Sequence, residues 1–506
     1  MFSTIDASVS PPRIELPRSY NAATDLLDRH VLEGRGDKIA VIDDRGSTTY
    51  EQLAMRADHA AGALAAMGVQ PEQRVAIVMH DSADWVAAFL GAIQLGAVPV
   101  PLNTNLTPAD YAYMLRDMRA RAVLVSESLR AKIVHDNVAV DGADWQEKLA
   151  LAPAITEPAE TTPDDVAFWL YSSGSTGKPK GAMHVHGSLI QTAALYAQPI
   201  LGIRGDDVVY SAAKLFFAYG LGNALTFPLS VGATAVLCAD RPTTATVLRV
   251  MRQHRPTIFG GVPTLFAQLL ADPGLTRDAV GPLRVSTSAG EALPRHVGER
   301  WRERTGSDIL DGIGSTEMLH IFLSNRPSEI AYGTTGKPVP GYELELRSEA
   351  GERVAGEGAL WVRGPTSCVG YWNDRARSLG TFHGPWTRTG DQYVANADGT
   401  WTYSGRADDM LKVGGIWVSP FEVESALAEH PAVLEAAVVG AEDKDGLVKP
   451  KAFVVLRATA TADELKAFVK DKLAPFKYPR WVEMVSELPK TATGKIQRFK
   501  LRDPNR

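Results

Sequence analysis

The 506-residue chain has only two cysteines, Cys238 and Cys368, and they lie far apart in the sequence. Two isolated cysteines provide neither a disulfide framework nor a zinc site, so we expect a reducing compartment, the cytoplasm. The chain also has no excess of positive charge, since its formal net charge is −6. We therefore expect neither nucleic acid nor an anionic membrane as a partner.

Targeting and membrane-spanning patterns are missing as well. Residues 1–20 contain no basic segment followed by an apolar core, so no signal peptide is predicted. The most apolar stretch, residues 85–102, is interrupted by Gln94, Gly96 and two prolines. These interruptions indicate a buried helix, a glycine stop and a strand instead of a membrane span. The chain has no internal repeats and no low-complexity tracts.

What the chain does contain is an alternation of short β-like runs and helical stretches from about residue 38. Helix starts are marked by Thr49 with Gln52, and by Thr107 followed by Pro108 and Asp110. Strands are expected at residues 38–42, 75–79, 122–125, 208–211, 234–238, 257–259 and 283–286. This repetition predicts an α/β fold with largely parallel sheets.

A chain of this length should divide into two or more domains. Residues 151–164 are rich in proline, threonine and acidic residues and indicate an exposed connector. Residues 333–403 have short segments and many glycines, which favours a β-rich subdomain. A boundary near residues 406–409 predicts a large N-terminal domain, 1–407, and a small α+β C-terminal domain, 408–506, with helix caps at Ser419 to Glu422.

The central motif is YSSGSTGKPKG, residues 171–181, which follows the apolar run 166–170. Glycines let the backbone approach a ligand closely, and the hydroxyl, N–H and lysine groups suit phosphate oxygens. A flexible linker is the alternative, but linkers seldom follow a buried strand in this way. A Walker A loop is excluded because only two residues separate Gly174 from Gly177 and because Pro179 follows Lys178. No phosphate-capping helix should begin there.

Two further loops follow predicted strands, SAGEA at 288–292 and DGIGSTE at 311–317. Loops after parallel strands share the carboxyl edge of the sheet, so both could meet the loop at 171–181. Glu317 could hold Mg²⁺, which usually binds one or two carboxylates together with substrate phosphates. An ordinary connection between a strand and a helix is the alternative for each turn taken alone.

Three later segments carry polar groups with weaker local signals. Asp391 follows the turn glycine Gly390, and its carboxylate could accept hydrogen bonds from ribose hydroxyls, with an Asx-turn as the alternative. The segment GRADDMLK, 405–412, reads as a charged linker when taken alone. Lys495, in PKTATGKIQR, could equally be a solubilising surface lysine.

Together, YSSGSTGKPKG, GSTE, TGD, GRADDMLK and PKTATGKIQR resemble the motifs of the adenylate-forming acyl-CoA synthetase superfamily, in order and spacing over nearly the whole chain. The segments 212–233 and 311–325 resemble most closely the benzoate-CoA ligases and their hydroxybenzoate-CoA ligase relatives. The resemblance implies the adenylate-forming fold with a mobile C-terminal domain. It also implies two half-reactions: adenylation of a carboxylate with release of pyrophosphate, then transfer of the acyl group to coenzyme A.

The resemblance also implies roles for individual residues. Thr316, Glu317 and Lys495 would be catalytic, with Glu317 also holding Mg²⁺; Asp408 would be the hinge, and Gly414 and Gly415 would face coenzyme A. The residues that would bind ATP and AMP are Ser172, Ser173, Gly174, Ser175, Thr176, Gly177, Lys178, Gly290, Glu291, Asp311, Gly312, Thr316, Asp391 and Arg406. The residues that would contact the acid are Phe217, Ala218, Tyr219, Gly312, Ile313 and His320.

Phe217 departs from the pattern, because many relatives have histidine at this gate position. Aromatic and small residues around the acid suit a flat ring. An apolar slot discriminates poorly against one small added substituent, so hydroxy-, amino- and halobenzoates stay open beside benzoate. Tyr219 and His320 carry polar ends that could face a ring hydroxyl.

These observations predict a ligase that uses ATP, Mg²⁺ and coenzyme A to activate benzoate or a close aryl carboxylate. Two alternatives are transfer of the acyl group to a carrier-protein thiol and a non-catalytic sensor of aryl acids or nucleotides. A sensor would not need Lys495, Glu317 and Asp391 together. The sequence leaves the oligomeric state open, with a homodimer among the options.

Overall fold

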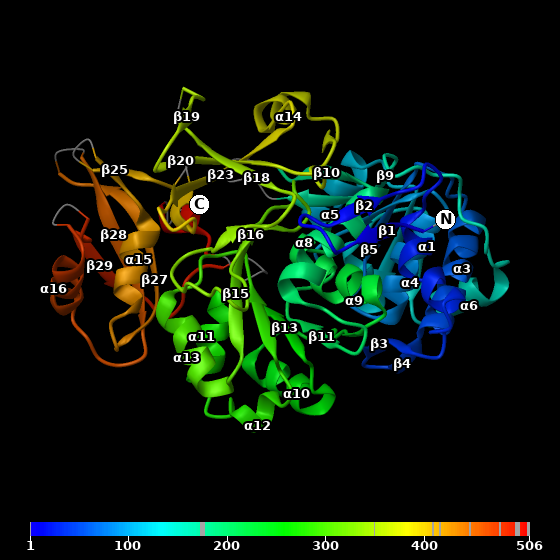
Figure 1. Cartoon of the computed structure of the whole chain (residues 1–506), viewed down its shortest axis with the longest axis horizontal. Helices are drawn as coiled ribbons and strands as arrows, with labels where there is room; N and C mark the ends of the chain where they lie inside the picture. Colours follow the sequence, from blue (N-terminus) through cyan, green and yellow to red (C-terminus); the bar gives the residue numbers. More distant parts are fainter. Residues whose placement is uncertain are drawn as a thin grey trace.

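The computed structural model describes residues 2–172, 178–348, 350–406, 409–413, 416–444, 447–474, 477–490 and 496–502. In Figure 1 the N-terminal part of the chain (blue to cyan) lies on the right, and the C-terminal part (orange to red) lies on the left. A sheet that includes β13 (Ile258–Gly261) and β15 (Asp308–Gly314) lies between them. The predicted α/β fold with a large N-terminal part and a small C-terminal part is confirmed.

Two early helices begin at the predicted capping boxes. At the start of α3 (Tyr50–Ala66), Thr49 Oγ1 accepts the Gln52 N–H and the Gln52 side chain accepts the Thr49 N–H. The start of α5 (Pro108–Asp117) has the same reciprocal pair between Thr107 and Asp110. Each box pairs two backbone N–H groups that a helix end leaves without partners. The other helices of this region are α1 (Ala22–Leu26), α2 (Asp28–Leu32), α4 (Ala83–Gln94) and α6 (Ala143–Leu151).

A four-stranded, all-parallel sheet forms the N-terminal region, in the order β6 (Val98–Pro101), β5 (Arg74–Val78), β7 (Ala122–Ser126) and β8 (Val138–Asp141). Strands β5, β6 and β7 are almost entirely buried. Strands covered on both faces read as continuous apolar runs, which is why β5 and β7 were recognisable in the sequence. The connector at 151–164 is largely exposed, as predicted.

A nine-stranded mixed sheet crosses the centre of the molecule. Its order is β17 (Lys337–Pro338), β16 (Ile321–Ser324), β15, β14 (Val285–Ser288), β13, β11 (Val208–Ser211), β12 (Thr234–Val236), β3 (Ile39–Asp43) and β4 (Gly46–Thr49). The strands from β15 to β3 are parallel, and the outer pairs are antiparallel. The accompanying helices are α10 (Thr244–His254), α11 (Pro263–Ala271), α12 (Arg277–Val280) and α13 (Arg295–Thr305).

The motif at 171–181 lies at the turn of a separate hairpin. β9 (Val166–Ser172) pairs antiparallel with β10 (Lys180–Val185), which pairs antiparallel with β21 (Gly370–Tyr371). The expectation that this loop is one of the loops of the parallel sheet was therefore wrong. Lys180 is paired with Ser172, so the chain returns at once and has no room for a crossover helix. The absence of a helix directly after Lys178 was predicted correctly.

After β10 the chain forms a run of short helical turns that reaches the acid pocket. These are α7 (His186–Thr192), a π-helical segment Ala193–Leu201, α8 (Ala218–Leu221), a second π-helical segment Gly222–Thr226, and α9 (Phe227–Val231).

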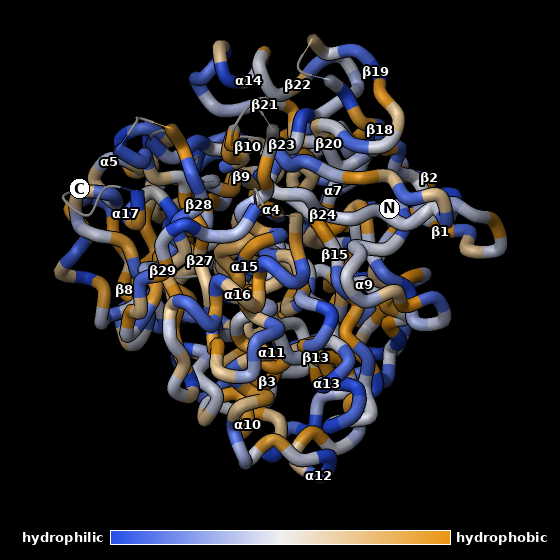
Figure 2. Tube along the Cα trace, turned by 90° about the vertical axis from the view of Figure 1, so that its left-hand side faces the viewer, coloured by the Kyte–Doolittle hydropathy of each residue, from blue (hydrophilic) through white to orange (hydrophobic). Residues whose placement is uncertain are grey.

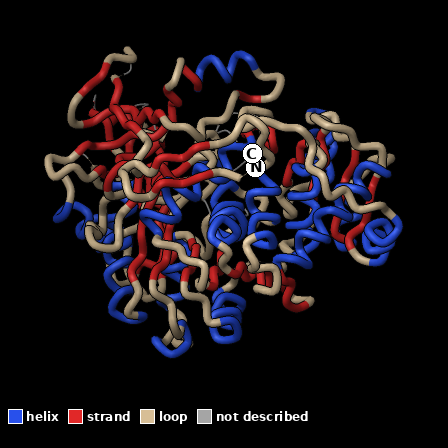
Figure 3. Tube along the Cα trace, turned by 45° about the vertical axis from the view of Figure 1, so that its right-hand side comes forward, coloured by secondary structure: helices blue, strands red, loops and turns tan. Residues whose placement is uncertain are grey.

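The predicted β-rich subdomain is present. It is an antiparallel sheet of β19 (Arg353–Val354), β18 (Glu343–Arg347), β20 (Glu357–Arg363), β23 (Trp386–Ala395), β22 (Phe382–His383) and β24 (Trp401–Arg406). Within the described part of residues 333–403 the only helix is α14 (Arg375–Thr381). Figure 3 shows many strands gathered at the upper left of the view, while strands and helices occur together elsewhere.

The C-terminal unit packs helices α15 (Pro420–Ala428) and α16 (Ala462–Lys472) against strands β27 (Val433–Glu442), β28 (Val448–Leu456) and β29 (Trp481–Met484). A small hairpin, β25 (Leu411–Val413) with β26 (Ile416–Val418), precedes it, and α17 (Arg498–Arg502) ends the described chain. Ala407 and Asp408 lie outside the described residues, so the boundary between 407 and 408 stays a prediction.

Apolar segments run through the interior of the molecule, as Figure 2 shows. Trp85, Phe89 and Phe168 are fully buried, and the Phe89 ring contacts the rings of the other two. No described helix is both long enough and apolar enough to cross a membrane.

Candidate active site

Two of the predicted loops meet at the carboxyl edge of the nine-stranded sheet. β14 and β15 are parallel neighbours, with Ser288 opposite Asp311, so the loop with Gly290 and Glu291 starts beside the residues of DGIGSTE. Gly290 has φ +94°, a left-handed conformation that favours glycine. Glu291 accepts a hydrogen bond of 2.9 Å from Thr264 Oγ1.

Asp311 is a buried carboxyl group at the end of β15. Its Oδ1 has no hydrogen-bond partner among the described residues. Burial raises the pKa of Asp311 well above its usual value, which favours the protonated form of this carboxyl group. A neutral carboxyl can both donate and accept a hydrogen bond, which matches an adenine edge with its amino donor and ring-nitrogen acceptors.

Glu317 lies where the hairpin β9–β10, strand β21 and the loop after β15 come together. Its Oε1 accepts hydrogen bonds from the Tyr371 hydroxyl (2.7 Å) and the Ser172 hydroxyl (3.4 Å), and it lies 3.4 Å from Lys180 Nζ. Lys180 Nζ also donates to the Tyr371 hydroxyl at 2.6 Å. The predicted meeting of the 171–181 motif with DGIGSTE therefore occurs at Ser172 and Glu317, between separate sheets.

These contacts keep Glu317 ionised. Burial alone would raise its pKa, but the Lys180 charge and the Tyr371 hydrogen bond together lower it below the usual value. An ionised, partly exposed carboxylate beside a phosphate-type loop fits a hard cation such as Mg²⁺, which keeps waters and substrate phosphates as its other ligands.

Thr316 is held in place through its backbone. His184 on β10 donates from Nε2 to the Thr316 carbonyl oxygen at 2.7 Å, and its ring stacks on Phe168. Burial lowers the pKa of His184 to about 4, so the imidazole is neutral and Nε2 carries the donated proton.

A cavity of about 1010 Å³ connects the predicted nucleotide and acid residues. Its lining includes Gly290, Glu291, Thr316, Phe217, Ala218, Tyr219 and His320. Asp311, Gly312 and Ile313 lie on β15 just before the lining residue Gly314 and do not line the cavity themselves. The structure therefore brings most of the predicted acid pocket into contact with the loop that carries Thr316.

The polar ends of the acid pocket are largely occupied. Tyr219 donates its hydroxyl to the Thr287 carbonyl oxygen at 2.8 Å. His320 Nε2 donates to the Tyr219 carbonyl oxygen at 3.4 Å, and its Nδ1 has no partner among the described residues. Burial lowers the pKa of His320 to about 3, so its ring is neutral, and it packs edge-on against Phe227. The ring faces of these residues leave an apolar, aromatic wall.

Asp391 and Arg406 are neighbours on paired strands of the β-rich sheet. They face each other on β23 and β24, with Arg406 Nη1 3.1 Å from Asp391 Oδ1. The turn expected at Gly390 is absent: this glycine lies within β23, where the pairing with β20 shifts register, and a Cβ there would lie 2.9 Å from Arg406 Nη2. Its φ of +79° favours glycine at this irregularity. The pair predicted for a ribose is therefore present as a unit.

Several predicted residues are not brought to the cavity or lie outside the described residues. Lys178 is exposed, and its ammonium lies over the Tyr113 ring at 5.2 Å from the centroid. The predicted residues that lie outside the described part of the chain are Ser173, Gly174, Ser175, Thr176, Gly177, Asp408, Gly414, Gly415 and Lys495. Their roles stay predictions, although Lys490, near Lys495 in the sequence, lines the cavity.

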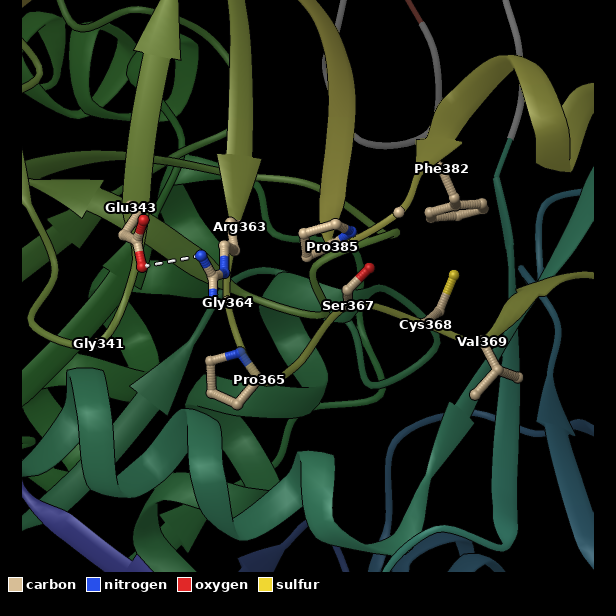
Figure 4. Close-up of a pocket in the computed structure, with 11 residues that line it drawn as sticks. Gly341, Glu343, Arg363, Gly364, Pro365, Ser367, Cys368, Val369, Phe382 and Pro385 are labelled. Carbon is tan, nitrogen blue, oxygen red and sulfur yellow. Dashed lines mark ion pairs between the residues drawn. The ribbon is translucent and has the colours of Figure 1, made fainter.

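A second cavity of about 700 Å³ lies behind the Glu317 loop, in the β-rich subdomain. Figure 4 shows the Arg363–Glu343 ion pair at one end, and Cys368 with Phe382 at the other. The Cys368 N–H donates to the Glu317 carbonyl oxygen at 2.8 Å. Burial raises the pKa of the Cys368 thiol to about 12, so it stays protonated. This wall supports the backbone of Glu317 and has no catalytic group of its own.

Sequence reasoning missed His184 and Tyr371, and it gave Lys180 a charge but no role. Tyr371 is 54 residues from Glu317 and His184 is 132 residues from Thr316, so no local pattern connects them. The only local signal was the position of His184 just after the motif at 171–181, and Tyr371 lies beside none of the motifs.

The chain matches the AMP-binding enzyme family over residues 27–372 and the AMP-binding enzyme C-terminal domain over residues 422–495. It is 55% identical to the benzoate–CoA ligase of Thauera aromatica, over 99% of both chains. It is 49% identical to a 4-hydroxybenzoate–CoA/benzoate–CoA ligase of Rhodopseudomonas palustris, over 96% of this chain and 94% of that one. A crystal structure of a benzoate CoA ligase from Burkholderia xenovorans covers 96% of this chain and 100% of its own, with 54% identity and a TM-score of 0.91.

The site geometry, the order of the motifs and these full-length similarities agree, and the chain belongs to the family of AMP-binding, adenylate-forming enzymes.

Proposed function

We propose that this chain is an AMP-forming benzoate–CoA ligase. Benzoate and ATP would give benzoyl-AMP and pyrophosphate, and the thiol of coenzyme A would then displace AMP to give benzoyl-CoA. The observation that supports this most strongly is the single cavity that joins an aromatic acid pocket to Thr316 and to the Gly290–Glu291 loop. Relatives that are named as benzoate–CoA ligases match the chain from end to end.

The first half-reaction brings two anions together, so the site must supply positive charge in a dry environment. A carboxylate oxygen of benzoate attacks the α-phosphorus, the bond to the bridging oxygen breaks, and pyrophosphate leaves with the electron pair. Bound at Glu317, Mg²⁺ would neutralise phosphate charge. Thr316, fixed by His184, would contact the α-phosphate, and Asp391 with Arg406 would hold the ribose hydroxyls.

Lys495 would bridge the acid carboxylate and the α-phosphate during adenylation only. A cation on a mobile domain can act in one step and leave before the next. We expect Lys495→Ala to reduce the rate of pyrophosphate release by at least about 100-fold, the order of one lost transition-state contact. Thioester formation from supplied benzoyl-adenylate should change much less. Equal losses in the two assays would remove this role from Lys495.

The second half-reaction needs room for the thiol arm of coenzyme A. At about 1010 Å³ the cavity is larger than one aryl ring needs, and Lys132 and Arg241 also line it. We assign these two cations to the phosphates of coenzyme A, and we keep Gly414 and Gly415 as the predicted contacts of its pantetheine arm.

Benzoate is favoured over hydroxybenzoates because the Tyr219 hydroxyl already donates its proton to the backbone of Thr287. It has no proton left for a ring hydroxyl and could only accept a hydrogen bond from one. His320 Nδ1 favours the second candidate, a hydroxybenzoate–CoA ligase, since this buried acceptor has no described partner and a substrate hydroxyl could donate to it.

A substrate panel tests the proposal. Pyrophosphate release is measured with benzoate, its hydroxy- and aminobenzoate analogues, a medium-chain fatty acid and an amino acid. We expect benzoate to have the highest kcat/KM, by about 10-fold or more over 4-hydroxybenzoate. Highest turnover on the fatty acid or the amino acid would overturn the acid assignment. Absence of acid-dependent pyrophosphate release would favour a sensor.

The acyl acceptor, the oligomeric state and the cellular location of the enzyme need separate measurements. A competition between coenzyme A and a carrier-protein thiol distinguishes the two acceptors. A homodimer and a cytoplasmic location stay predictions, to be checked by sedimentation and by cell fractionation.

A further inference from the structure

Asp81 is a buried carboxylate that the proposed mechanism does not use. It lies between β5 and α4, directly before the helix cap Ser82, and it is only 5% exposed. Its neighbour His80 lines the active cavity, but Asp81 is not among the described residues that line it. A carboxylate is seldom buried in this way unless it has partners, so the groups that face it indicate what it does.

The partners of Asp81 lie in the chain that follows β11. Asp81 Oδ1 accepts the Leu215 N–H at 3.3 Å, and Oδ2 lies 4.0 Å from Lys214 Nζ. Leu215 is 134 residues away in the sequence, so this contact joins the chain after the four-stranded sheet to the chain after the nine-stranded sheet. Burial raises the pKa of Asp81 to about 6, while Lys214 and the Leu215 N–H oppose that rise, so the carboxylate is ionised at pH 8.

Lys214 has further partners on the chain after β12. Its Nζ donates to the carbonyl oxygens of Cys238 and Asp240, the latter at 2.7 Å. The Lys214 carbonyl oxygen accepts the Phe217 N–H at 3.0 Å, which closes a turn over residues 214–217. The first residue of this turn is therefore tied to the chain after β12, and its second residue is the one whose N–H the buried carboxylate accepts.

The 214–217 turn leads directly into the aromatic wall of the acid pocket. Phe217, its last residue, lines the active cavity. The next two residues, Ala218 and Tyr219, begin α8 and line the cavity as well. α8 also packs on the turn, because a Cβ at Gly220 would lie 2.0 Å from the Lys214 carbonyl oxygen. Contacts this close leave no free space, so a shift of the turn would be felt in the pocket wall.

We propose that Asp81 is a positioning residue for the acid pocket: by accepting the Leu215 N–H it fixes the 214–217 turn, and the turn places Phe217 against the acid. This inference rests on the proposed function, in which Phe217 contacts the aryl acid. Among the described residues, no contact joins Asp81 to a residue assigned to ATP. Loss of Asp81 should therefore affect use of the acid and leave use of ATP unchanged.

The test measures pyrophosphate release by the full-length enzyme at pH 8 and determines the KM for benzoate and the KM for ATP. Asp81→Ala leaves the Leu215 N–H without its acceptor. We expect the KM for benzoate to rise by about 10-fold or more, since loss of a hydrogen bond to a charged group changes an equilibrium constant by that order. The KM for ATP should stay within about 2-fold. Asp81→Asn keeps an acceptor oxygen for the Leu215 N–H, so its KM for benzoate should be within about 3-fold of wild type.

Asp207→Ala is the matched control. Asp207 is also buried and accepts a backbone N–H, that of Arg204 at 2.8 Å, but it lies just before the other end of β11. Its loss should lower the melting temperature at least as much as loss of Asp81, because Arg284 also loses its charge partner, while both KM values stay near wild type. If Asp81→Ala does not fold, Asp81→Ser takes its place with the same expected rise, since its side chain is one atom too short to reach the Leu215 N–H.

A double variant tests whether Asp81 acts through Phe217. Phe217→Ala removes the side chain that the turn places, so adding Asp81→Ala to it should raise the KM for benzoate by less than about 3-fold more. Full additivity, equal rises in the two KM values, an equal rise in Asp81→Asn and Asp81→Ala, or an unchanged KM for benzoate in Asp81→Ala would overturn the positioning role. Failure of the wild-type enzyme to release pyrophosphate with benzoate would instead overturn the proposed function, and this inference with it.

Discussion

Gly222 makes room for the imidazole of His320 in the acid pocket. A Cβ at this position would lie 2.3 Å from His320 Cδ2 and 2.5 Å from its Nε2, with Phe227 Cζ at 3.0 Å. Gly222 has φ −63°, so its backbone does not require glycine, and the space beside it is the reason for a small residue. The shape of the acid pocket therefore depends on the absence of a side chain at Gly222.

We expect Gly222→Ala to displace His320 and to weaken use of benzoate. Overpacking a tight site costs about 1–3 kcal/mol, so kcat/KM for benzoate should fall by roughly 10- to 100-fold. The KM for ATP should stay within about 2-fold. Gly380→Ala is the matched control, because a Cβ at that helical, exposed glycine would meet nothing within 4 Å. An unchanged kcat/KM for benzoate in Gly222→Ala would mean that the pocket yields without cost.

The hydrogen bond from the Tyr371 hydroxyl helps to keep Glu317 ionised. Burial raises the pKa of Glu317, while Lys180 and Tyr371 lower it, and the net shift is downward. The carboxylate therefore contributes to stability above its unfolded pKa, near 4.5, and that contribution is lost as pH falls through the lower folded-state value.

We expect Tyr371→Phe to raise the pKa of Glu317, because a hydrogen bond that lowers it is removed. The acid limb of the pH profile of pyrophosphate release should move to higher pH. Activity at pH 8 should change little, since Lys180 remains beside an ionised carboxylate. Tyr478→Phe, in the C-terminal unit, is the control and should leave the limb in place. A limb that stays at the same pH in Tyr371→Phe contradicts this account of Glu317.

At the scale of elements, local sequence signals predicted the starts of helices well. The pairing of strands that lie far apart in the sequence was not predicted. The capping boxes at Thr49 and Thr107 could be identified because both partners lie within one helical turn. The hairpin β9–β10 was misassigned to the edge of the parallel sheet, because its partner β21 lies far along the chain. A strand's direction in a sheet depends on such distant partners, which apolar patterning does not reveal.

The same reason explains which parts of the site were predicted. Motif residues such as Thr316, Glu317 and Asp391 could be assigned from the sequence by resemblance. The contacts of Lys180 and Tyr371 with Glu317, and of His184 with Thr316, form only when the chain folds, so they required the structure. The elements that carry them, β10 and β21, are adjacent in one sheet, which makes that sheet the support of the catalytic loop.

At the scale of the whole molecule, the site is assembled from elements that no single sheet provides. The cavity is lined by residues of the large part, including Thr316, and by Lys490 of the C-terminal unit. Asp391, the residue predicted for the ribose, lies in the β-rich subdomain. When a site is divided between units in this way, a rigid-body movement of one unit changes which residues face the cavity. Lys490 and Arg498 are both paired within the C-terminal unit, with Glu435 and Glu424, so a movement of this unit as a body would break neither pair.

The two half-reactions then place different demands on the connection between the units. In the proposed function, Lys495 acts at the cavity during adenylation and leaves it before thiol attack, and Asp408 is the predicted hinge for that movement. We expect Asp408→Pro, which fixes φ near −65°, to slow thioester formation by about 100-fold or more while pyrophosphate release in the first turnover changes much less. Asp408→Ala removes the same side chain but leaves the backbone free, and it should retain most of the thioester rate. Parallel measurements of the two half-reactions decide the matter: normal overall turnover by Asp408→Pro would show that the C-terminal unit need not rotate about this residue.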